Sequence, residues 1–452
     1  MRIIIVGCGK IGTALIGALV REGHDVVAVD NRPEILNRLT NQYDVMCLPG
    51  NGADFETLSE AGVERAELLI SLTSSDELNM LICFLAKRRG ARHTIARIRN
   101  PQYNRSSLDF LRQQLDLSMP LNPELLTAQE IHNVLQLPAA SKVETFSLNS
   151  FEMVELRIKE DSPLIGHQLM DLRDHFRAKF LICVVQRGNE VVIPRGNFVL
   201  QSGDRIGITA DRSELWKLLK QTGLARRQSK KIMLVGGSRI AYYLSKRLQS
   251  SGSKVVLIEV DKTRSEQLHG TLPNAQVFHA DGTDQERLLE FGLLNQDAFV
   301  SLTGMDEENL LLAYNAKIQQ VGQVIAKINR DEIVQMAEQM GLENVISPKN
   351  VVVNVVLRYV RALENSMDSS IEKLYQLMDG KAEALEFVVP APAPFTNIQL
   401  KNLHLKKNIL IAGLLRNNAA IIPDGEDMIL PGDRVVVISG QRKLKAMMDI
   451  LQ

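Results

Sequence analysis

Three glycines near the start of the chain have the type and spacing of a phosphate-binding turn. Gly7, Gly9 and Gly12 follow an apolar run at residues 3–6 and precede a helical apolar pattern that continues to Glu22. Gly7 would permit the tight turn, Gly9 would let backbone approach a pyrophosphate, and Gly12 would let the helix pack closely on its strand. The amides that begin this helix would face the phosphates. An ordinary strand-to-helix turn is the alternative.

A carboxylate follows at the position expected for ribose recognition. A second apolar run at residues 26–29 ends in Asp30, and 30 − 12 places it 18 residues after Gly12. An acid at the end of this strand can bind a ribose diol, and it argues against a 2′-phosphate. Arg32 weakens that exclusion, because a nearby guanidinium can accommodate the extra phosphate. The stretch therefore predicts a dinucleotide-binding unit.

The elements that would position these residues alternate between strand and helix. We expect further strands at 44–48, 68–73 and 94–98, with a helix beginning near Asp76. This alternation indicates a parallel, doubly wound sheet. Arg97 and Arg99 would share one face of the last strand, since side chains alternate along a strand. Ion pairs with acidic residues at 76 and 77 are the alternative role for these arginines.

The composition narrows the classes of partner and compartment. Lys plus Arg equal Asp plus Glu at 53 each in 452 residues, so no net charge favours nucleic acid, and we expect no nucleic-acid partner. The longest apolar stretches are far shorter than the ~20 residues of a spanning helix. The chain enters a core strand directly from Met1, so we expect no signal peptide.

Cysteine and histidine usage predicts a reducing compartment and no metal site. The four cysteines are dispersed, and the eight histidines show no metal-ligand spacing. Cys8, inside the glycine turn, is interpreted as a small residue that fills the turn, with redox chemistry as the alternative.

The whole sequence pattern occurs twice in the chain, as an internal repeat. Residues 231–241 match the opening stretch, with 236 − 7 = 229 between Gly7 and Gly236, and the same offset carries Asp30 to Glu259. A strand-rich stretch with one helix near 215–219 follows the first unit, and its Gly-Asp-Arg turn at 203–205 recurs at 432–434. A basic linker at 223–230 would join the halves, and the proline-rich run at 391–394 would form a loop.

The fold class is therefore α/β, with two doubly wound parallel Rossmann-like sheets, each followed by a small α+β module. The four expected domains are residues 1–140, 141–225, 226–365 and 366–452.

This arrangement resembles the tandem RCK proteins that regulate potassium conductance. The resemblance covers essentially the entire chain and rests on residues 3–12, Asp30, residues 71–79 and 96–101, the Gly-Asp-Arg turns and the repeat offset. It implies a cytoplasmic regulator that binds NAD(H), ATP or ADP and is not an enzyme. It also implies a homo-oligomer, a tetrameric ring, docked on the inner face of the membrane beneath a potassium channel or transporter subunit of the Trk type.

The resemblance implies two nucleotide sites when its residues are carried over by position. The first would use Gly7, Cys8, Gly9, Lys10, Ile11, Gly12, Asp30, Asn31, Arg32, Asn51, Thr73, Ser74, Arg97 and Arg99, and the second would use Gly236, Gly237, Ser238, Arg239, Ile240 and Glu259.

The two sites are expected to be unequal. Ser238 replaces the close-approach glycine, and residues 327–329 read Lys-Ile-Asn in place of the Arg-Ile-Arg at 97–99. The two guanidiniums of the first site predict discrimination between ATP and ADP. The second site, which keeps an acid for a diol, is expected to take NAD(H) with different affinity.

Three alternatives stay open at this point. A nicotinamide-dependent dehydrogenase is the rival function, although the small modules lack a matched set of acid–base residues. The helix at 351–360 is apolar on more than one face, so either a neighbouring subunit or this chain's own core must cover it. The small modules either bind a further ligand or join subunits.

Overall fold

The structure is a computed structural model of the full-length chain. It describes residues 1–103, 105–136, 142–146, 151–224, 229–368, 371–390, 393–417, 419–440, 444 and 447–451. The predicted linker at 223–230 and the predicted loop at 391–394 lie partly outside the described residues.

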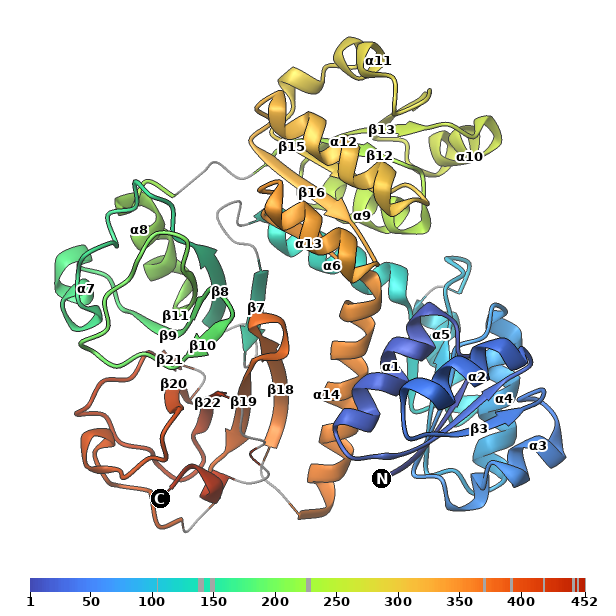
Figure 1. Cartoon of the computed structure of the whole chain (residues 1–452), viewed down its shortest axis with the longest axis horizontal. Helices are drawn as coiled ribbons and strands as arrows, with labels where there is room; N and C mark the ends of the chain where they lie inside the picture. Colours follow the sequence, from blue (N-terminus) through green and yellow to red (C-terminus); the bar gives the residue numbers. More distant parts are fainter. Residues whose placement is uncertain are drawn as a thin grey trace.

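The first unit is a parallel, doubly wound sheet with helices on both faces, as predicted (Figure 1), and it has six strands where the sequence indicated five. Its strand order is β3-β2-β1-β4-β5-β6, and the central strand β1 is an apolar run that is almost wholly buried. The sequence did not indicate the short edge strand β6. The elements are β1 (Arg2–Val6), α1 (Lys10–Arg21), β2 (Asp25–Asp30), α2 (Pro33–Gln42), β3 (Met46–Pro49), α3 (Phe55–Glu60), β4 (Leu68–Ser71), α4 (Asp76–Arg88), β5 (His93–Arg97), α5 (Arg105–Gln114), β6 (Met119–Leu121) and α6 (Pro123–Gln136).

The second unit repeats this architecture with the order β14-β13-β12-β15-β16-β17, again all parallel. Its elements are β12 (Lys231–Val235), α9 (Arg239–Ser250), β13 (Lys254–Glu259), α10 (Lys262–Thr271), β14 (Ala275–His279), α11 (Gln285–Glu290), β15 (Ala298–Ser301), α12 (Asp306–Ile318), β16 (Gln323–Lys327), α13 (Asp331–Gln339), β17 (Asn344–Ile346) and α14 (Pro348–Asp368).

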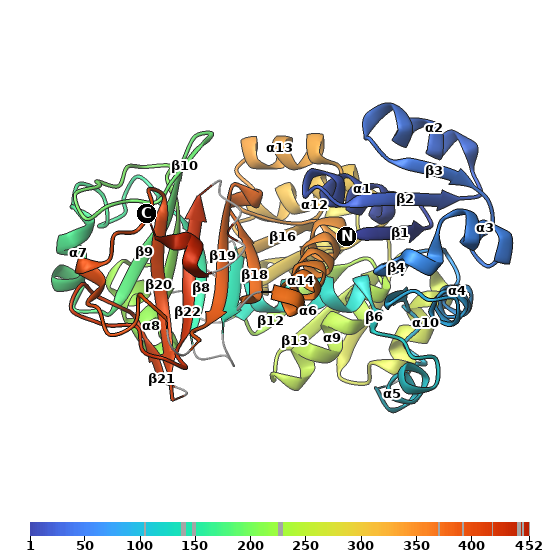
Figure 2. The same ribbon diagram turned by 90° about the horizontal axis from the view of Figure 1, so that it is seen from below.

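Each small module is built on a five-stranded antiparallel sheet, and the two sheets lie side by side (Figure 2). The sheet orders are β10-β9-β11-β8-β7 and β18-β19-β22-β20-β21. The helix α8 was predicted, whereas α7 was not. The elements are β7 (Lys142–Phe146), β8 (Phe151–Arg157), α7 (Leu169–Phe176), β9 (Phe180–Arg187), β10 (Glu190–Val192), β11 (Arg205–Ala210), α8 (Arg212–Gln221), β18 (Ile371–Leu377), β19 (Ala382–Val388), β20 (Ile409–Arg416), β21 (Ala419–Ile421) and β22 (Arg434–Gly440).

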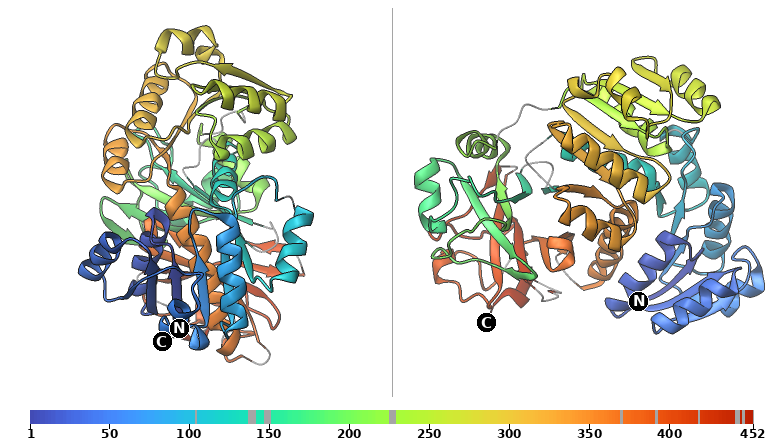
Figure 3. Two further views of the ribbon diagram at one scale, coloured as in Figure 1. Left: turned by 90° about the vertical axis from the view of Figure 1, so that its right-hand side faces the viewer. Right: turned by 45° about the horizontal axis from the view of Figure 1, so that its top comes forward.

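The two small modules join the halves of the chain to one another. The Thr209 hydroxyl donates to the carbonyl of Ala412 at 2.9 Å, and the Met378 amide donates to Glu155 at 3.1 Å. A buried apolar cluster contains side chains from both modules. In Figure 3 the modules form one side of the molecule and the two Rossmann-like units form the other. The two small modules therefore pack on one another within one chain.

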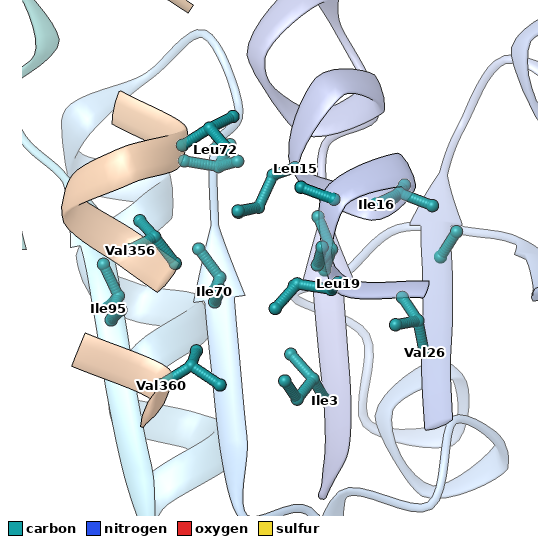
Figure 4. Close-up of a cluster of buried hydrophobic side chains, with 14 of the residues drawn as sticks. Ile3, Leu15, Ile16, Leu19, Val26, Ile70, Leu72, Ile95, Val356 and Val360 are labelled. Carbon is teal, nitrogen blue, oxygen red and sulfur yellow. The ribbon is translucent and has the colours of Figure 1, made fainter. Parts of the chain in front are cut away.

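Helix α14 belongs to the second half in sequence but covers the sheet of the first unit. At 21 residues it is roughly 30 Å long, enough to run from one unit to the other. Figure 4 shows Val356 and Val360 of α14 facing Ile70, Ile95 and the core around α1. The structure thus shows the intramolecular alternative for this apolar helix. The buried face of α14 is covered by the other half of the same chain.

Helix α6 makes the reciprocal exchange. It ends the first unit in sequence, yet its buried side chains belong to the core of the second unit beside α9. The side-chain amide of Gln323, on β16, donates to the carbonyl of Val134 on α6 at 2.9 Å. Each Rossmann-like unit is therefore completed by a helix from the other.

A buried ionic junction fixes α14 in place. The Arg361 guanidinium contacts Glu22, at the end of α1, at 2.5 and 2.9 Å, and contacts Glu383 of β19 at 2.9 Å. The side chains are largely buried, so loss of one partner would leave an uncompensated charge. The junction ties the first unit, the crossing helix and the second small module together.

The packing of α14 predicts that replacing a leucine by alanine lowers stability far more on this helix than at an exposed position. Leu357 is 2% exposed and lies in the first unit's core, so Leu357→Ala should lower the free energy of unfolding by about 2–5 kcal/mol. Leu294, which is 62% exposed, is the matched control, and Leu294→Ala should change stability by less than about 0.5 kcal/mol. Urea unfolding followed by circular dichroism measures both. Equal effects would contradict the exchange of α14.

Candidate functional site

The first glycine turn lies at the carboxyl end of β1, where the strand order reverses between β2 and β4. Crevices at this point of an open α/β sheet are the usual ligand sites. Gly7 has φ +92°, and a Cβ there would lie 2.8 Å from the carbonyl carbon of Leu72. A Cβ on Gly12 would overlap the carbonyl oxygen of Gly7. The fold itself therefore requires both of these glycines.

Gly9 has no such structural reason to be glycine. Its φ is −68°, which any residue adopts, and a Cβ there would meet no atom within 4 Å. It is the N-cap of α1 but has no side chain to accept the first-turn amides. The space in front of it combines unpaired helix donors with room for a group that approaches the backbone. This is the geometry of an anion site.

The Asp30 carboxylate points toward the glycine turn and is buried. It accepts the amide of Cys8 at 2.7 Å and the amide of Arg32 at 3.0 Å, and the Arg32 guanidinium binds both of its oxygens. Burial alone would raise the pKa of Asp30, but the hydrogen bonds from Arg32 and Cys8 outweigh it and hold the pKa below its usual range. The acid is thus ionised and directed at the crevice.

Arg97, the last residue of β5, and Arg99, two residues beyond it, are not equivalent. Arg99 lies beyond the end of β5, not on the strand with Arg97, and its guanidinium contacts Asp76 at 3.4 Å and the carbonyl of Ser74. The ion-pair alternative thus describes Arg99. Arg97, with 18% of its side chain exposed, has only a 4.0 Å contact to Glu124, and within the described residues its buried Nε has no hydrogen-bond partner.

The polar residue that organises these strand ends is Asn79, to which the sequence analysis assigned no role. Its side chain accepts the amide and hydroxyl of Thr73, both at 2.8 Å, and donates to the carbonyl of Arg97 at 2.9 Å. Asn309 makes the same contacts with the backbone of Thr303 in the second unit. Its recurrence 309 − 79 = 230 residues later is the signal that could have identified it.

The remaining residues predicted for the first site lie around the crevice. Lys10 begins α1 and is exposed, Ile11 is half-buried, and Asn31 is exposed directly after Asp30. Asn51 is exposed on the loop after β3, where its side chain accepts the amide of Ala53 at 3.0 Å.

Cys8 is buried against the turn. Burial raises the pKa of its thiol, which opposes thiolate chemistry and favours the interpretation of a filler residue.

The second glycine turn closes its own helix start. Gly236 has φ +98°, as at Gly7, but Ser238 caps α9 by accepting the amide of Ala241 at 3.4 Å. Ile240 is buried beneath this turn. The Ser238 hydroxyl therefore accepts a first-turn amide of α9, whereas Gly9 provides no side-chain cap for α1. This difference is in line with the expectation of unequal sites.

The acids of the two sites differ by one methylene, and the neighbouring residue compensates for it. Glu259 accepts the amide of Gly237, and a Cβ at that position would lie 2.5 Å from both Glu259 Oε2 and Leu268 Cδ1. The shorter side chain of Asp30 leaves room for Cys8 at the matching position. The acid and the second residue of each turn therefore form a matched pair.

The carboxyl end of β5 in the first unit lies close to α9 of the second unit. Burial and the charge of Arg99 lower the pKa of Arg97, and Arg239, which begins α9 of the second unit, lowers it further. In the reverse direction, burial lowers the pKa of Lys327, as does the charge of Lys10 on the first turn. The Tyr243 hydroxyl of α9 donates to the carbonyl of Arg99 at 3.2 Å. Charge at one crevice is thus felt at the other.

Two features that would indicate other functions are absent from the described residues. Within that part of the chain, no group of three or more His, Cys, Asp or Glu side chains has the arrangement of a metal site. No helix among the same residues has the length and apolar character needed to span a bilayer.

Sequence comparison identifies the domain types. The chain matches the TrkA-N domain over residues 3–113 and 232–348, and the TrkA-C domain over 153–223 and 384–452. It is 30% identical over 452 residues to a Trk system potassium uptake protein TrkA homolog of Archaeoglobus fulgidus, with all of both chains covered. It is also 30% identical to Trk system potassium uptake protein TrkA of Haemophilus influenzae, over 98% of this chain and 96% of that one. These matches confirm the predicted resemblance.

Solved structures share the fold over nearly the whole chain. The GsuK RCK domain aligns with a TM-score of 0.64 at 18% identity, covering 97% of this chain and 92% of that one. The GsuK channel bound to NAD aligns with a TM-score of 0.63 at 18% identity, covering 97% and 77%. At these identities the likeness establishes the tandem architecture alone.

The two glycines of the first turn should respond differently to alanine. Gly12→Ala should lower the free energy of unfolding by about 1–3 kcal/mol, because its methyl overlaps the Gly7 carbonyl. Gly9→Ala should change it by less than about 0.5 kcal/mol, because the added Cβ meets no protein atom. Urea unfolding of both variants makes the comparison, and comparable losses would mean that the fold requires Gly9.

Proposed function

The chain belongs to the TrkA family of potassium transport regulatory proteins, and from this membership we propose that it is the cytoplasmic nucleotide-binding subunit that gates a Trk-type potassium channel or transporter. The observation that carries the proposal is the open space at Gly9, where α1 has no side-chain cap and an added Cβ would meet no atom within 4 Å. We propose that NAD(H) and ATP or ADP bind there as regulatory ligands.

The first site holds the pieces for such a ligand in one crevice. The pyrophosphate would lie on residues 7–12 and face the amides of α1, with Lys10 beside it. The adenine ribose would approach Asp30 and Asn31, and the loop of Asn51 and the strand end at Thr73 would border the crevice. Solved forms of GsuK with NAD and with ADP support the same two ligand classes for this fold.

Arg97 is the residue proposed to distinguish ATP from ADP. Its guanidinium is mostly buried, its acidic neighbour is 4.0 Å away, and its Nε has no partner among the described residues. A terminal phosphate would supply the missing acceptor, and charge-assisted bonds of this kind are the strong ones. Arg99 has no comparable freedom, because Asp76 and Ser74 already hold it.

We propose that ligand binding changes the relative orientation of the two units. Each unit is completed by a helix of the other, and the cations of one crevice lie in the field of the other. A coupling of ~1–3 kcal/mol per ligand is typical, so several sites in a homo-oligomer would be needed for a decisive change.

The proposed assembly is a homo-oligomeric ring, tetrameric by the family resemblance, on the inner face of the membrane. Met305, Leu311 and Ile318 are exposed by 59–64% along α12 and the residue before it, an apolar surface suited to contact between copies. Residues 1–140 and 226–365 would act as the nucleotide-binding domains, and residues 141–225 and 366–452 as the modules that join them.

A gating assay tests the proposal. The full-length chain should co-purify with a membrane potassium transporter, and potassium flux through that partner should change when ATP, ADP, NAD or NADH is added. Gly9→Ala, whose methyl would occupy the pyrophosphate position, should abolish the change without loss of the fold. A flux that ignores all four nucleotides would contradict the proposal, and turnover of a nicotinamide cofactor with a metabolite would favour a dehydrogenase.

Arg97→Ala should narrow the difference between the affinities for ATP and ADP by about tenfold, because it removes a charged donor worth ~1.5 kcal/mol or more to the terminal phosphate. Arg88→Ala is the control, since it makes the same charge change at the exposed far end of α4. Isothermal titration calorimetry gives both affinities. An undiminished preference in the Arg97 variant would place the terminal phosphate elsewhere.

A further inference from the structure

The Arg32 guanidinium lies on the oxygens that the proposed ribose would need. The Asp30 carboxylate accepts four N–H groups, from the amides of Cys8 and Arg32 and from Nε and Nη2 of Arg32, at 2.7–3.1 Å. An ionised carboxylate offers about four lone-pair sites, so the acceptor capacity of Asp30 is filled. A ribose diol can bind this acid only if one of those donors leaves.

Only the side chain of Arg32 is free to leave. The two backbone amides are fixed by the turn and by the end of β2, and the Asp30 side chain is 3% exposed. The Arg32 side chain is 51% exposed, so water competes with its ion pair and the guanidinium can rotate outward at small cost.

The second unit shows that the turn does not need this guanidinium. The position equivalent to Arg32 is 32 + 229 = 261, an aspartate whose side chain accepts the amide of Arg264 and caps α10. Glu259 accepts two backbone amides, from Gly237 and Asp261, and no side-chain donor contacts it in the part of the chain that the structure describes. One half of the chain thus has a free acid and the other has an acid covered by arginine.

We propose that Arg32 sets the ribose specificity of the first site. A nucleotide with a free 2′,3′-diol must displace the guanidinium from Asp30, whereas a ribose 2′-phosphate offers the same guanidinium a new partner beside the acid. Arg32 therefore weakens binding of diol nucleotides such as NAD and strengthens binding of their 2′-phosphorylated forms such as NADP. This inference rests on the proposed function, in that it takes the first crevice as a nucleotide site.

The test compares NAD and NADP by calorimetry on full-length chains that carry Glu259→Ala, so that the first site alone reports. Arg32→Ala should tighten NAD binding by about 2- to 5-fold, because the competing ion pair is gone. It should weaken NADP binding by about tenfold or more, because the charged partner of the 2′-phosphate is lost. Arg32→Gln should move both affinities in the same directions.

The control is Arg38→Ala, which makes the same charge change on α2, the helix that follows Arg32; among the described residues, Arg38 donates to the carbonyl of Glu34 at 3.3 Å. It should leave both affinities unchanged. If the Arg32 variants move NAD and NADP together, or move neither, the inference is overturned.

Asp30→Ala distinguishes failure of the proposed role of Arg32 from failure of the proposed nucleotide site. If it weakens NAD while the Arg32 variants change nothing, the nucleotide site stands and the role of Arg32 fails. If Asp30→Ala also leaves NAD unaffected, the first site itself is wrong.

Discussion

The exchange of helices α6 and α14 is the constraint on which the rest of the molecule depends. Each parallel sheet has an apolar face that the helices of its own half cover only in part, and in both cases the other half supplies the remaining helix. Burial of that face is the dominant driving force for the packing of the two halves. The Arg361 junction orients α14 by holding it to the first unit and to the second small module. Neither unit has a complete core by itself.

This dependence explains how the two proposed nucleotide sites would be coupled. A change at α1 is passed to α14 through the core and through Glu22, and α14 leads directly to β18 of the second small module. The modules in turn are joined sheet to sheet. A ligand that shifts one unit must therefore disturb packing in the other, because close-packed interfaces do not deform continuously.

The two halves differ at residues that would touch a ligand in the proposed sites. The apolar strands are alike in the two halves, and Asn79 and Asn309 accept equivalent threonine amides. The acids at 30 and 259 differ, and so do the turn residues beside them, at 8 and 237. The first turn keeps an open helix start and a covered acid; the second has a capped helix start and an uncovered acid. Two copies of one architecture thus carry two different glycine turns.

The sequence by itself determined the parallel sheets, the repeat, the requirement for glycine at Gly7 and the placement of Asp30 at a strand end, because each depends on short-range periodicity and backbone sterics. Only the tertiary structure decided that α14 covers the opposite unit, that Arg99 pairs with Asp76, and that Arg32 lies on Asp30. A local pattern shows that an apolar face or a charge needs a partner, but it does not show which one. Arg361 and Glu22 lie 339 residues apart, and only folding brings them together.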